Sequence, residues 1–576
     1  MYGSRLPMLG ALAALALGAP ALPAQAALKP KVEIPFNRLY DYDEILAHFR
    51  RLNEAHPHFT RIETIGRSFE GRPMVVFTIA NPETGPEEKK AAMWVDGNVH
   101  GNEVQGSEAA LYLAWYLLEH SDDLPKAQEL LDRRVFYILP SQNPDGRAYW
   151  FREANTSSTS RSGTRPLDND RDGLLDEDGP NDLDGDGHLV QMRKRVPDGN
   201  WRLDPDDPRV MVPVERGKTG DFVMLGLEGI DDDGDGRVNE DGPGGYDMNR
   251  NWPSDWQPNY VQFGAGDYPL CFPETRAIAD FLLAHPNVAA AQSFHNSGGM
   301  ILRGPGAQSR EGDTPAADVS VYDALARDGE FMLPFYRYMV IWKDLYTVHG
   351  GFVNWTYEGL GIFSFSNELW ADEQYAGRKE GLDSKARLKW NDLLMLGEEF
   401  VDWHPFEHPQ YGTIEIGGFK KMTGRVPPPW MIEEMCHRNA LFCLMHADEM
   451  PLPAIEPLEA ERIGDSTYAV TAVVRNERTI PTRSSRAAQK GIGRPDLLRI
   501  EGPAVEVLAG GRLRDRFRPE SVDLVEHEPG RLVLERGIGS HARERFRWIV
   551  RGTGTVTVTF DAEKGGAVSA TATLAP

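Results

Sequence analysis

The chain has few cysteines, and their spacing leaves little scope for cross-links. Its 576 residues include three Cys. Cys436 and Cys443 lie on a predicted helix over residues 430–450, bounded by prolines. Seven helical residues rise by about 10 Å, which is too far for a disulfide bond. At most one disulfide, involving Cys271, can form, so a disulfide framework is excluded.

The chain also lacks an excess of positive charge. Its formal net charge is −25, and binding to phosphate backbones needs the opposite sign, so we expect no nucleic-acid partner. Hydrophobic residues make up 41% of the chain and aromatic residues 10%. This composition is sufficient for a globular protein with one large core and a smaller companion domain.

Long apolar runs are absent beyond the N-terminus. In residues 1–26, Arg5 precedes an apolar stretch over residues 9–22, and Ala24-Gln25-Ala26 is typical of a signal-peptidase site. Prolines interrupt this run, which is shorter than the ~20 residues of a membrane span. We expect a signal peptide, a mature chain that begins near Ala27 without a stable membrane span, and export to the periplasm or the medium.

The remaining chain divides into two kinds of sequence. Residues 27–450 alternate short β-rich runs with helical stretches such as 105–119 and 273–283, which predicts an α/β catalytic domain. Residues 451–576 contain alternating strands bounded by turns, which predicts an all-β sandwich. The strands expected there are TYAVTAVVRN, RLVLER, RFRWIVR, TVTVTFDAE and AVSATATL. No candidate ligand cluster falls in this second domain, so we expect a stabilising or docking role for it.

Two polar motifs follow predicted buried strands. His100 and Glu103 come after the apolar run AAMWV, and His295 closes the run VAAAQSF. Two imidazoles and a carboxylate form the ligand set of a catalytic zinc that keeps one position open. A lone H-x-x-E spacing is common by chance, and the third ligand in an equivalent place makes a zinc site the better interpretation.

An Asp/Gly-rich insertion occupies about residues 155–245. It contains a repeat, DNDRDGLLDEDGP at 168–180 and DDDGDGRVNEDGP at 231–243, with a shorter relative at 182–187. Carboxylates at alternate positions before a glycine turn resemble the first half of a calcium loop, although the Glu of an EF-hand is absent at the twelfth position. Asp178 and Asp241 are candidates to complete the shell. A solvated acidic loop is the alternative. The predicted calcium ligands are Asp168, Asp170, Asp172, Asp176, Asp178, Asp182, Asp184, Asp186, Asp231, Asp233, Asp235, Asn239 and Asp241.

Three further polar residues suit peptide hydrolysis. Glu368 ends the β-rich run GIFSFSNEL and could serve as a general base, although a strand-end acid is the simpler interpretation. Asn249 and Arg250 in YDMNRNWP could hold a planar carboxylate in two-point fashion, or could form a surface salt bridge.

Taken together, these motifs resemble the M14 zinc carboxypeptidase family, in its carboxypeptidase A-like form. The matches occur in family order over about residues 35–400: IGRSFEGRP, HGNE at 100–103, NPDGR at 143–147, NRNWP at 249–253, SFH at 293–295 and the block from Tyr346 to Leu369. The resemblance implies an α/β fold with a mixed β-sheet flanked by helices. It also implies one catalytic zinc and a peptide substrate with a free C-terminus.

The resemblance also assigns roles to individual residues. It implies that Glu368 is the general base, that Asn249 and Arg250 bind the terminal carboxylate, and that Tyr346 closes over the substrate. Arg193 resembles the arginine that polarises the scissile carbonyl, with Arg195 as the competitor. Val353 falls at the floor of the specificity pocket, where an apolar residue favours apolar or aromatic end residues over Lys or Arg. Few residues separate the signal site from the family-like region, so we expect no inhibitory pro-domain.

The leading hypothesis is therefore an exported zinc metallocarboxypeptidase with structural calcium. One alternative is a zinc amidase or peptidase that acts on cell-wall peptides or N-acyl amino acids. An alternative of another class is a non-catalytic, calcium-dependent binding protein. Neither the physiological substrate nor the oligomeric state follows from the sequence.

Overall fold

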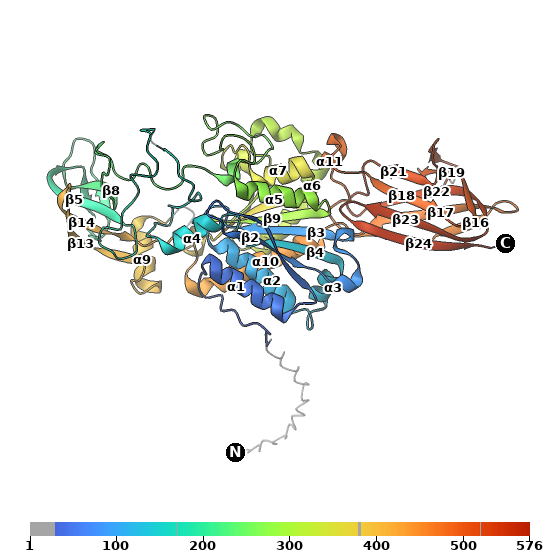
Figure 1. Cartoon of the computed structure of the whole chain (residues 1–576), viewed down its shortest axis with the longest axis horizontal. Helices are drawn as coiled ribbons and strands as arrows, with labels where there is room; N and C mark the ends of the chain where they lie inside the picture. Colours follow the sequence, from blue (N-terminus) through green and yellow to red (C-terminus); the bar gives the residue numbers. More distant parts are fainter. Residues whose placement is uncertain (1–28, 170, 378–381, 516, 519, 576) are drawn as a thin grey trace, which may run out of the picture.

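The computed structural model describes residues 29–575 apart from 170, 378–381, 516 and 519, and without the side chains of 373 and 374. The predicted signal peptide and Asp170 of the first acidic loop lie outside the described residues. The molecule is elongated, with an α/β body in the middle and a β-rich unit at each end (Figure 1). The described part contains no helix with the length and apolar character needed to cross a membrane.

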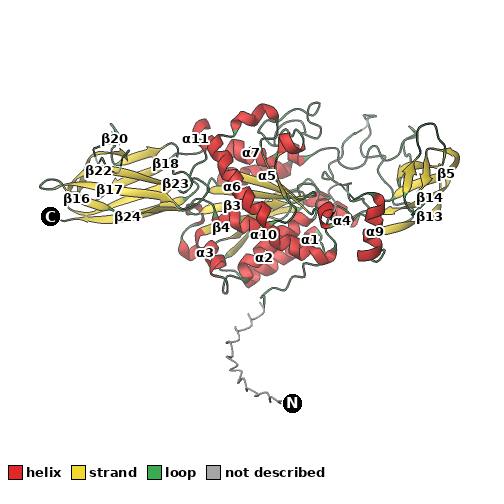
Figure 2. Ribbon diagram, turned by 180° about the vertical axis from the view of Figure 1, so that it is seen from behind, coloured by secondary structure: helices red, strands yellow, loops and turns green. Residues whose placement is uncertain are grey.

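A mixed eight-stranded sheet forms the centre of the described body. Its order is β1-β2-β4-β3-β9-β12-β10-β11, and β4, β3, β9 and β12 run parallel to one another. Every residue of β3, β4 and β9 is buried, because helices cover both faces of the sheet (Figure 2). The strands are β1 (Thr60–Arg67), β2 (Pro73–Ile79), β3 (Ala91–Gly97), β4 (Arg134–Leu139), β9 (Val288–Asn296), β10 (Met300–Arg303), β11 (Arg337–Val340) and β12 (Phe363–Leu369).

The helices divide between the two faces of this sheet. One apolar cluster joins the sheet to α1, α2, α6 and α10, and another joins it to α5 and α7. The helices of the body are α1 (Tyr42–Ala55), α2 (Gln105–Glu119), α3 (Pro125–Arg133), α4 (Pro144–Arg152), α5 (Pro273–Ala284), α6 (Ala316–Met332), α7 (Phe352–Leu360), α8 (Asp372–Tyr375), α9 (Ser384–Leu394) and α10 (Ile432–Asp448). The helices predicted over 105–119 and 273–283 correspond to α2 and α5.

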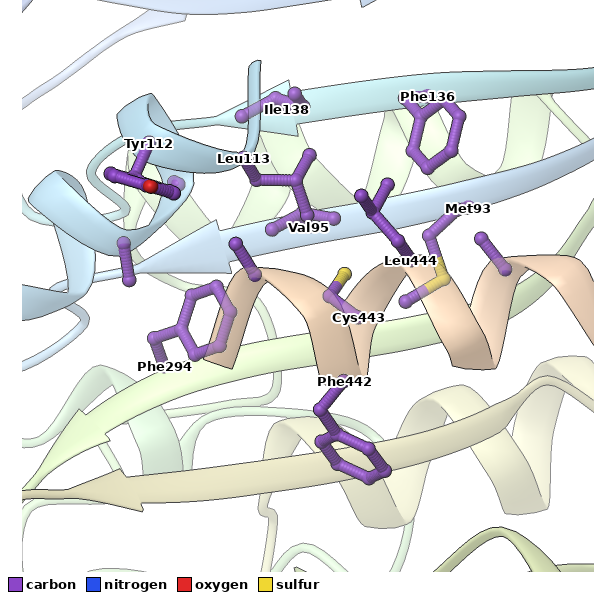
Figure 3. Close-up of a cluster of buried hydrophobic side chains, with 14 of the residues drawn as sticks. Met93, Val95, Tyr112, Leu113, Phe136, Ile138, Phe294, Phe442, Cys443 and Leu444 are labelled. Atoms are coloured by element: carbon purple, nitrogen blue, oxygen red, sulfur yellow. The ribbon is translucent and has the colours of Figure 1, made fainter. Parts of the chain in front are cut away.

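Figure 3 shows how α10 closes the first cluster. Cys443 and Leu444 of this helix lie beside Met93 and Val95 of β3. Cys443 is fully buried, and burial raises the pKa of its thiol well above the usual value. All three cysteines lie in the described part of the chain and none is disulfide-bonded. The Cys443 side chain therefore acts as a small apolar group in the core.

A second sheet, which we call the satellite sheet, lies at one end of the body. Within the described residues its order is β13-β14-β5-β8-β6-β7. Four strands come from the acidic insertion and two from a later hairpin, so the insertion is completed by a distant segment. The strands are β5 (Gln191–Gly199), β6 (Trp201–Leu203), β7 (Met211–Pro213), β8 (Gly220–Leu227), β13 (Phe400–His408) and β14 (Gly412–Phe419).

The C-terminal domain consists of two antiparallel sheets around their own apolar cluster, which confirms the predicted β-rich companion. Its elements are β15 (Pro453–Ile455), β16 (Glu459–Arg462), β17 (Thr467–Asn476), α11 (Ser485–Lys490), β18 (Asp496–Glu501), β19 (Val505–Leu513), β20 (Val522–Leu524), β21 (Arg531–Leu534), β22 (Arg543–Gly552), β23 (Gly554–Ala562) and β24 (Gly566–Leu574).

This domain docks on the edge of the body where the parallel strands begin. Lys564 donates to the carbonyl of Val288, the first residue of β9, at 2.6 Å. Arg134, the first residue of β4, donates to the carbonyl of Pro451 at 2.8 Å. The polar motifs that were predicted to form the site lie at the opposite edge, where β3 and β9 end.

Candidate metal centre and substrate pocket

The three predicted zinc ligands meet at the carboxyl ends of two neighbouring parallel strands. His100 and Glu103 lie in the turn between β3 and α2, and His295 is the second-last residue of β9. Glu103 Oε1 lies 2.9 Å from His100 Nδ1, and Glu103 Oε2 lies 2.9 Å from His295 Nδ1. All three residues are buried, and one donor atom of each lies within 4.8 Å of the others. A single ion can therefore contact all three.

The protonation states of the side chains in this cluster favour metal binding. Burial alone would raise the pKa of Glu103, but the two imidazoles outweigh it and hold that pKa well below its usual value. His100 Nδ1 is buried and faces Glu103, whereas its Nε2 lies 3.1 Å from Asp247 Oδ1. When Asp247 accepts a hydrogen bond from Nε2, the proton stays on Nε2 and Nδ1 is left free to bind a metal. Two nitrogens and a carboxylate in this arrangement fit zinc.

A cavity of about 300 Å³ opens beside the cluster. The predicted substrate-binding residues Asn249, Arg250 and Val353 line it, and so does Tyr346, which was predicted to close over the substrate. The Asn249 side-chain oxygen accepts from the backbone N–H of Phe352 at 2.8 Å, which ties the start of α7 to the loop that carries Arg250. Tyr346 is 52% exposed at the rim, whereas Val353 is buried. The cavity thus combines a cationic anchor, an apolar wall and an aromatic side chain at its mouth.

Glu368 lines the same cavity from β12. Its strand pairs with β9 in a register that puts Glu368 opposite His295. Burial, followed by the negative charge of Glu103, raises the pKa of Glu368 to about 7. A carboxylate with this pKa can exchange protons near neutral pH, as general acid–base catalysis requires.

The prediction for Arg193 is wrong, and so is its alternative Arg195. Both lie on β5 of the satellite sheet, outside the cavity. Arg193 Nε donates to Glu415 at 2.6 Å, and its guanidinium stacks 4.0 Å from the centre of the Trp403 ring. This segment lies inside the acidic insertion, so its distance in sequence from NPDGR was a poor guide to its position.

Two arginines that the sequence did not single out line the cavity instead. Arg161 Nη1 lies 3.3 Å from Glu103 Oε1, and its Nη2 lies 3.1 Å from Asp247 Oδ2. Arg425 Nη1 lies 3.5 Å from Glu103 Oε1 and donates to the carbonyl of Asn296 at 2.9 Å. Arg161 precedes the acidic repeats and Arg425 follows the satellite hairpin. Neither stands in a motif that would have marked it.

The acidic repeats fold into loops with the same internal hydrogen bonds. In each loop the first Asp accepts from the backbone N–H groups three and five residues later: Asp168 from Arg171 and Gly173, Asp182 from Gly185 and Gly187, and Asp231 from Gly234 and Gly236. The repeated spacing therefore specifies one backbone conformation three times.

Each loop also receives a buried carboxylate from another segment. Asp241 accepts from the N–H groups of Asn169 and Asp176 in the first loop. In the same way, Asp178 accepts from the N–H groups of Asp232 and Asn239 in the second loop. The third loop has an equivalent partner, Glu228, which accepts from Leu183 and Val190.

The acidic side chains of the loops gather in groups. Asp178 lies with Asp231 and Asp233 of the opposite loop, Glu228 lies with Asp182 and Asp184, and Glu240 lies with Asp233 and Asp235. Both carboxylate oxygens of Glu240 are buried without a hydrogen-bond partner in the described part of the chain. The sequence did not mark Glu228 or Glu240. Asp172, Asp176, Asp186 and Asn239 belong to the loops, and Asp170 is not described.

Comparisons with known proteins follow the division of the fold. The zinc carboxypeptidase family model matches residues 45–177 and 224–391, which together make up just over half of the chain. A domain family of unknown function matches residues 453–573.

Curated relatives match over short segments. Human carboxypeptidase Z is 37% identical over 108 residues, which are 19% of this chain and 17% of the relative. Carboxypeptidase D of Anas platyrhynchos is 28% identical over 207 residues, 35% of this chain and 13% of the relative. A Saccharomyces cerevisiae relative, inactive metallocarboxypeptidase ECM14, is 30% identical over 127 residues, 22% of this chain and 29% of the relative. The chain thus matches less than a third of the length of each.

Among solved structures, carboxypeptidase A from Helicoverpa armigera is 17% identical, covering 72% of this chain and 75% of that chain with a TM-score of 0.44.

Proposed function

Because the chain belongs to the zinc carboxypeptidase family, we propose that it is an exported metallocarboxypeptidase that removes the C-terminal residue of peptides. One observation carries the proposal. A single cavity joins the His100, Glu103 and His295 cluster, the half-buried carboxyl of Glu368 and the guanidinium of Arg250. A metal, a base and an anchor for a terminal carboxylate are the parts that exopeptidase chemistry requires. The N-terminal signal pattern supports export.

Each residue has a definable part in this reaction. Zinc bound by the triad would polarise the scissile carbonyl and make water more acidic. Arg250 and Asn249 hold the terminal carboxylate, which fixes the last peptide bond beside the triad. Glu368 takes a proton from the attacking water and delivers it to the leaving amine. The guanidinium of Arg161 lies beside the cluster and stabilises the negative charge that develops on the carbonyl oxygen.

The cavity wall favours an apolar or aromatic end residue. Apart from Glu103 and Glu368, no described residue that lines it is acidic. The other wall residues include Leu302, Ile341, Leu345, Val348 and Val353, all apolar. A basic end residue would bury its charge there without a partner, which is costly.

The decisive assay compares matched peptides with free and amidated C-termini, followed by mass spectrometry. We expect the free form to lose one residue and the amidated form to resist, because only a free carboxylate can pair with Arg250. Equal cleavage of both would favour the alternative amidase. Glu368→Gln should retain zinc and lose nearly all turnover. Glu399→Gln is a matched control, since burial likewise raises the pKa of Glu399 to about 7 outside the cavity.

An inactive protein remains the alternative of another class, and one relative is named as inactive. The presence of the triad together with Glu368 and Arg161 favours catalysis. Zinc binding without cleavage of any peptide with a free C-terminus would support the calcium-dependent binding function instead.

We further propose that the acidic loops bind structural calcium. Three loops repeat one backbone, each with a buried carboxylate beside it, and Glu240 has two buried oxygens that a cation would satisfy. Calorimetry should show calcium binding that is weakened when Asp231 and Asp233 are both changed to Asn. The double variant Asp198→Asn, Asp221→Asn, which changes exposed acids of the same insertion, is the control. No heat at millimolar calcium would restore the solvated-loop interpretation.

A further inference from the structure

A second cavity, which we call the side groove, adjoins the substrate cavity. Its volume is also about 300 Å³, and it shares Ser297 and Arg425 with the first. The rest of its wall consists of Ser157, Ser158, Arg387, Phe419, Thr423 and Gly424. The insertion, α9 and the satellite hairpin with the loop after it therefore build a surface that continues from the metal site.

The wall of the side groove is cationic and free of acids. Arg387 and Arg425 are each about a quarter exposed, with 28% and 27% of their side-chain surface accessible. Four hydroxyl side chains line the groove as well, and none of the described lining residues is a carboxylate. In a chain with a net charge of −25, such a wall marks a place where an anion is favoured over a cation.

Local geometry brings the two arginines together. Gly424 has a φ of +77°, and a Cβ added there would lie 1.9 Å from Arg387 Nη1. The guanidinium of Arg387 therefore rests on the backbone immediately before Arg425. Arg387 Nη2 lies 3.2 Å from Asp372 Oδ2, and Arg425 Nη1 is held by the carbonyl of Asn296. Both side chains are fixed by neighbours and keep further donors for a ligand.

The position of the side groove relative to Arg250 indicates which residues of a bound peptide lie in the groove. Arg250, Tyr346 and Val353 line only the first cavity, whereas the groove opens beyond Ser297 and Arg425. With the last residue of a peptide at Arg250 and the scissile bond at the metal, the preceding residues extend along the groove. Arg425 lies outside the ranges that match the family model, whereas Arg387 lies inside them, so the matched region contributes part of this wall.

We propose that the side groove is a subsite for an acidic side chain on one of the two residues that precede the scissile bond, with Arg387 and Arg425 as its partners. This inference rests on the proposed carboxypeptidase function. It adds a specificity for the acyl side of the substrate to the preference for the end residue. Charge-assisted hydrogen bonds to a guanidinium provide the selectivity.

Three peptides with one apolar end residue and a common N-terminal fluorophore test this subsite. The reference has Gln at both preceding positions, and each of the others has Glu at one of them. We expect one Glu peptide to exceed the reference about tenfold in kcat/KM, mainly through KM, because Glu and Gln differ only in charge. High salt should reduce the ratio.

Variants assign the preference to the groove. Arg387→Met should reduce the ratio towards one, Arg387→Lys should restore part of it, and Arg438→Met, which removes an ion pair on α10, should leave it unchanged. Binding of the same peptides to the Glu368→Gln enzyme, followed by fluorescence anisotropy, gives the ratio independently of turnover. Equal rates and affinities for Glu and Gln peptides, or a preference that survives Arg387→Met, would overturn the subsite. Failure to cleave any of the three would instead refute the carboxypeptidase function.

Discussion

Replacing Asp247 by Asn tests whether this carboxylate orients the metal site. Asp247 Oδ1 lies 3.1 Å from His100 Nε2, and Oδ2 accepts from Arg161 Nη2 at 3.1 Å. Burial alone would raise the pKa of Asp247, but the charges of His100, Arg250 and Arg161 hold it well below the usual value. The side chain is therefore ionised in the fold, and the substitution removes a buried negative charge with almost no change of shape.

The expected loss is in zinc affinity. Removing a carboxylate behind a ligating imidazole weakens metal binding by about 10- to 100-fold, which corresponds to about 1.4 to 2.7 kcal/mol. The fold should survive, because an Asn oxygen can still accept from the N–H of Asn249, which lies 2.8 Å from Asp247 Oδ1. We expect a normal far-UV spectrum together with the weaker binding.

The assay is competition for zinc against a chromogenic chelator at neutral pH. Asp145→Asn is the matched control, since Asp145 is also buried and accepts from Ser68 and Arg72 without contacting a predicted zinc ligand. It should reduce stability and leave zinc affinity unchanged. A folded Asp247→Asn protein that binds zinc as tightly as the parent would refute the positioning role.

Three further predictions address other parts of the molecule. Arg161→Met should lower kcat by about 10²- to 10³-fold, whereas Arg193→Met should leave it nearly unchanged; equal losses in steady-state assays would restore Arg193 to the site. Burial raises the pKa of Glu274 to about 7. The folded state therefore keeps a proton that the unfolded chain has already released at lower pH. The stability that this proton contributes is lost as pH rises through 7. Between about pH 5 and 8, urea denaturation should show Glu274→Gln gaining up to about 3 kcal/mol relative to the parent, and parallel curves would contradict this. Asp318→Ala leaves the N–H groups of Ser485 and Arg486 without their acceptor, so calorimetry should show a loss of roughly 3 kcal/mol, and an unchanged transition would exclude this contact as a domain anchor.

The sequence could predict what depends on local spacing. An H-x-x-E pair after a buried strand keeps its two side chains on one turn, and β3 and β9 end at the same edge of the sheet. The meeting of His100, Glu103 and His295 therefore followed from strand placement. The helix α2 was predictable to the residue, because its apolar residues and the polar turn before it are contiguous.

Other features depend on contacts between distant segments. The satellite sheet needs β14 to pair with β5, and their residues Glu415 and Arg193 lie far apart in the chain. That pairing places Arg193 outside the cavity beside His100, Glu103 and His295.

The sequence by itself determined the ligand types, their spacing and the repeat of the acidic loops. Only the tertiary structure decided which arginines lie beside the candidate metal ligands, which carboxylate supports each loop, and that a cationic groove adjoins the site. The physical reason is that backbone conformation and short spacing are set by neighbouring residues, whereas the charge around a cavity is set by whichever segments fold against it. Arg425 shows this: no motif marks it, yet its guanidinium lies 3.5 Å from Glu103.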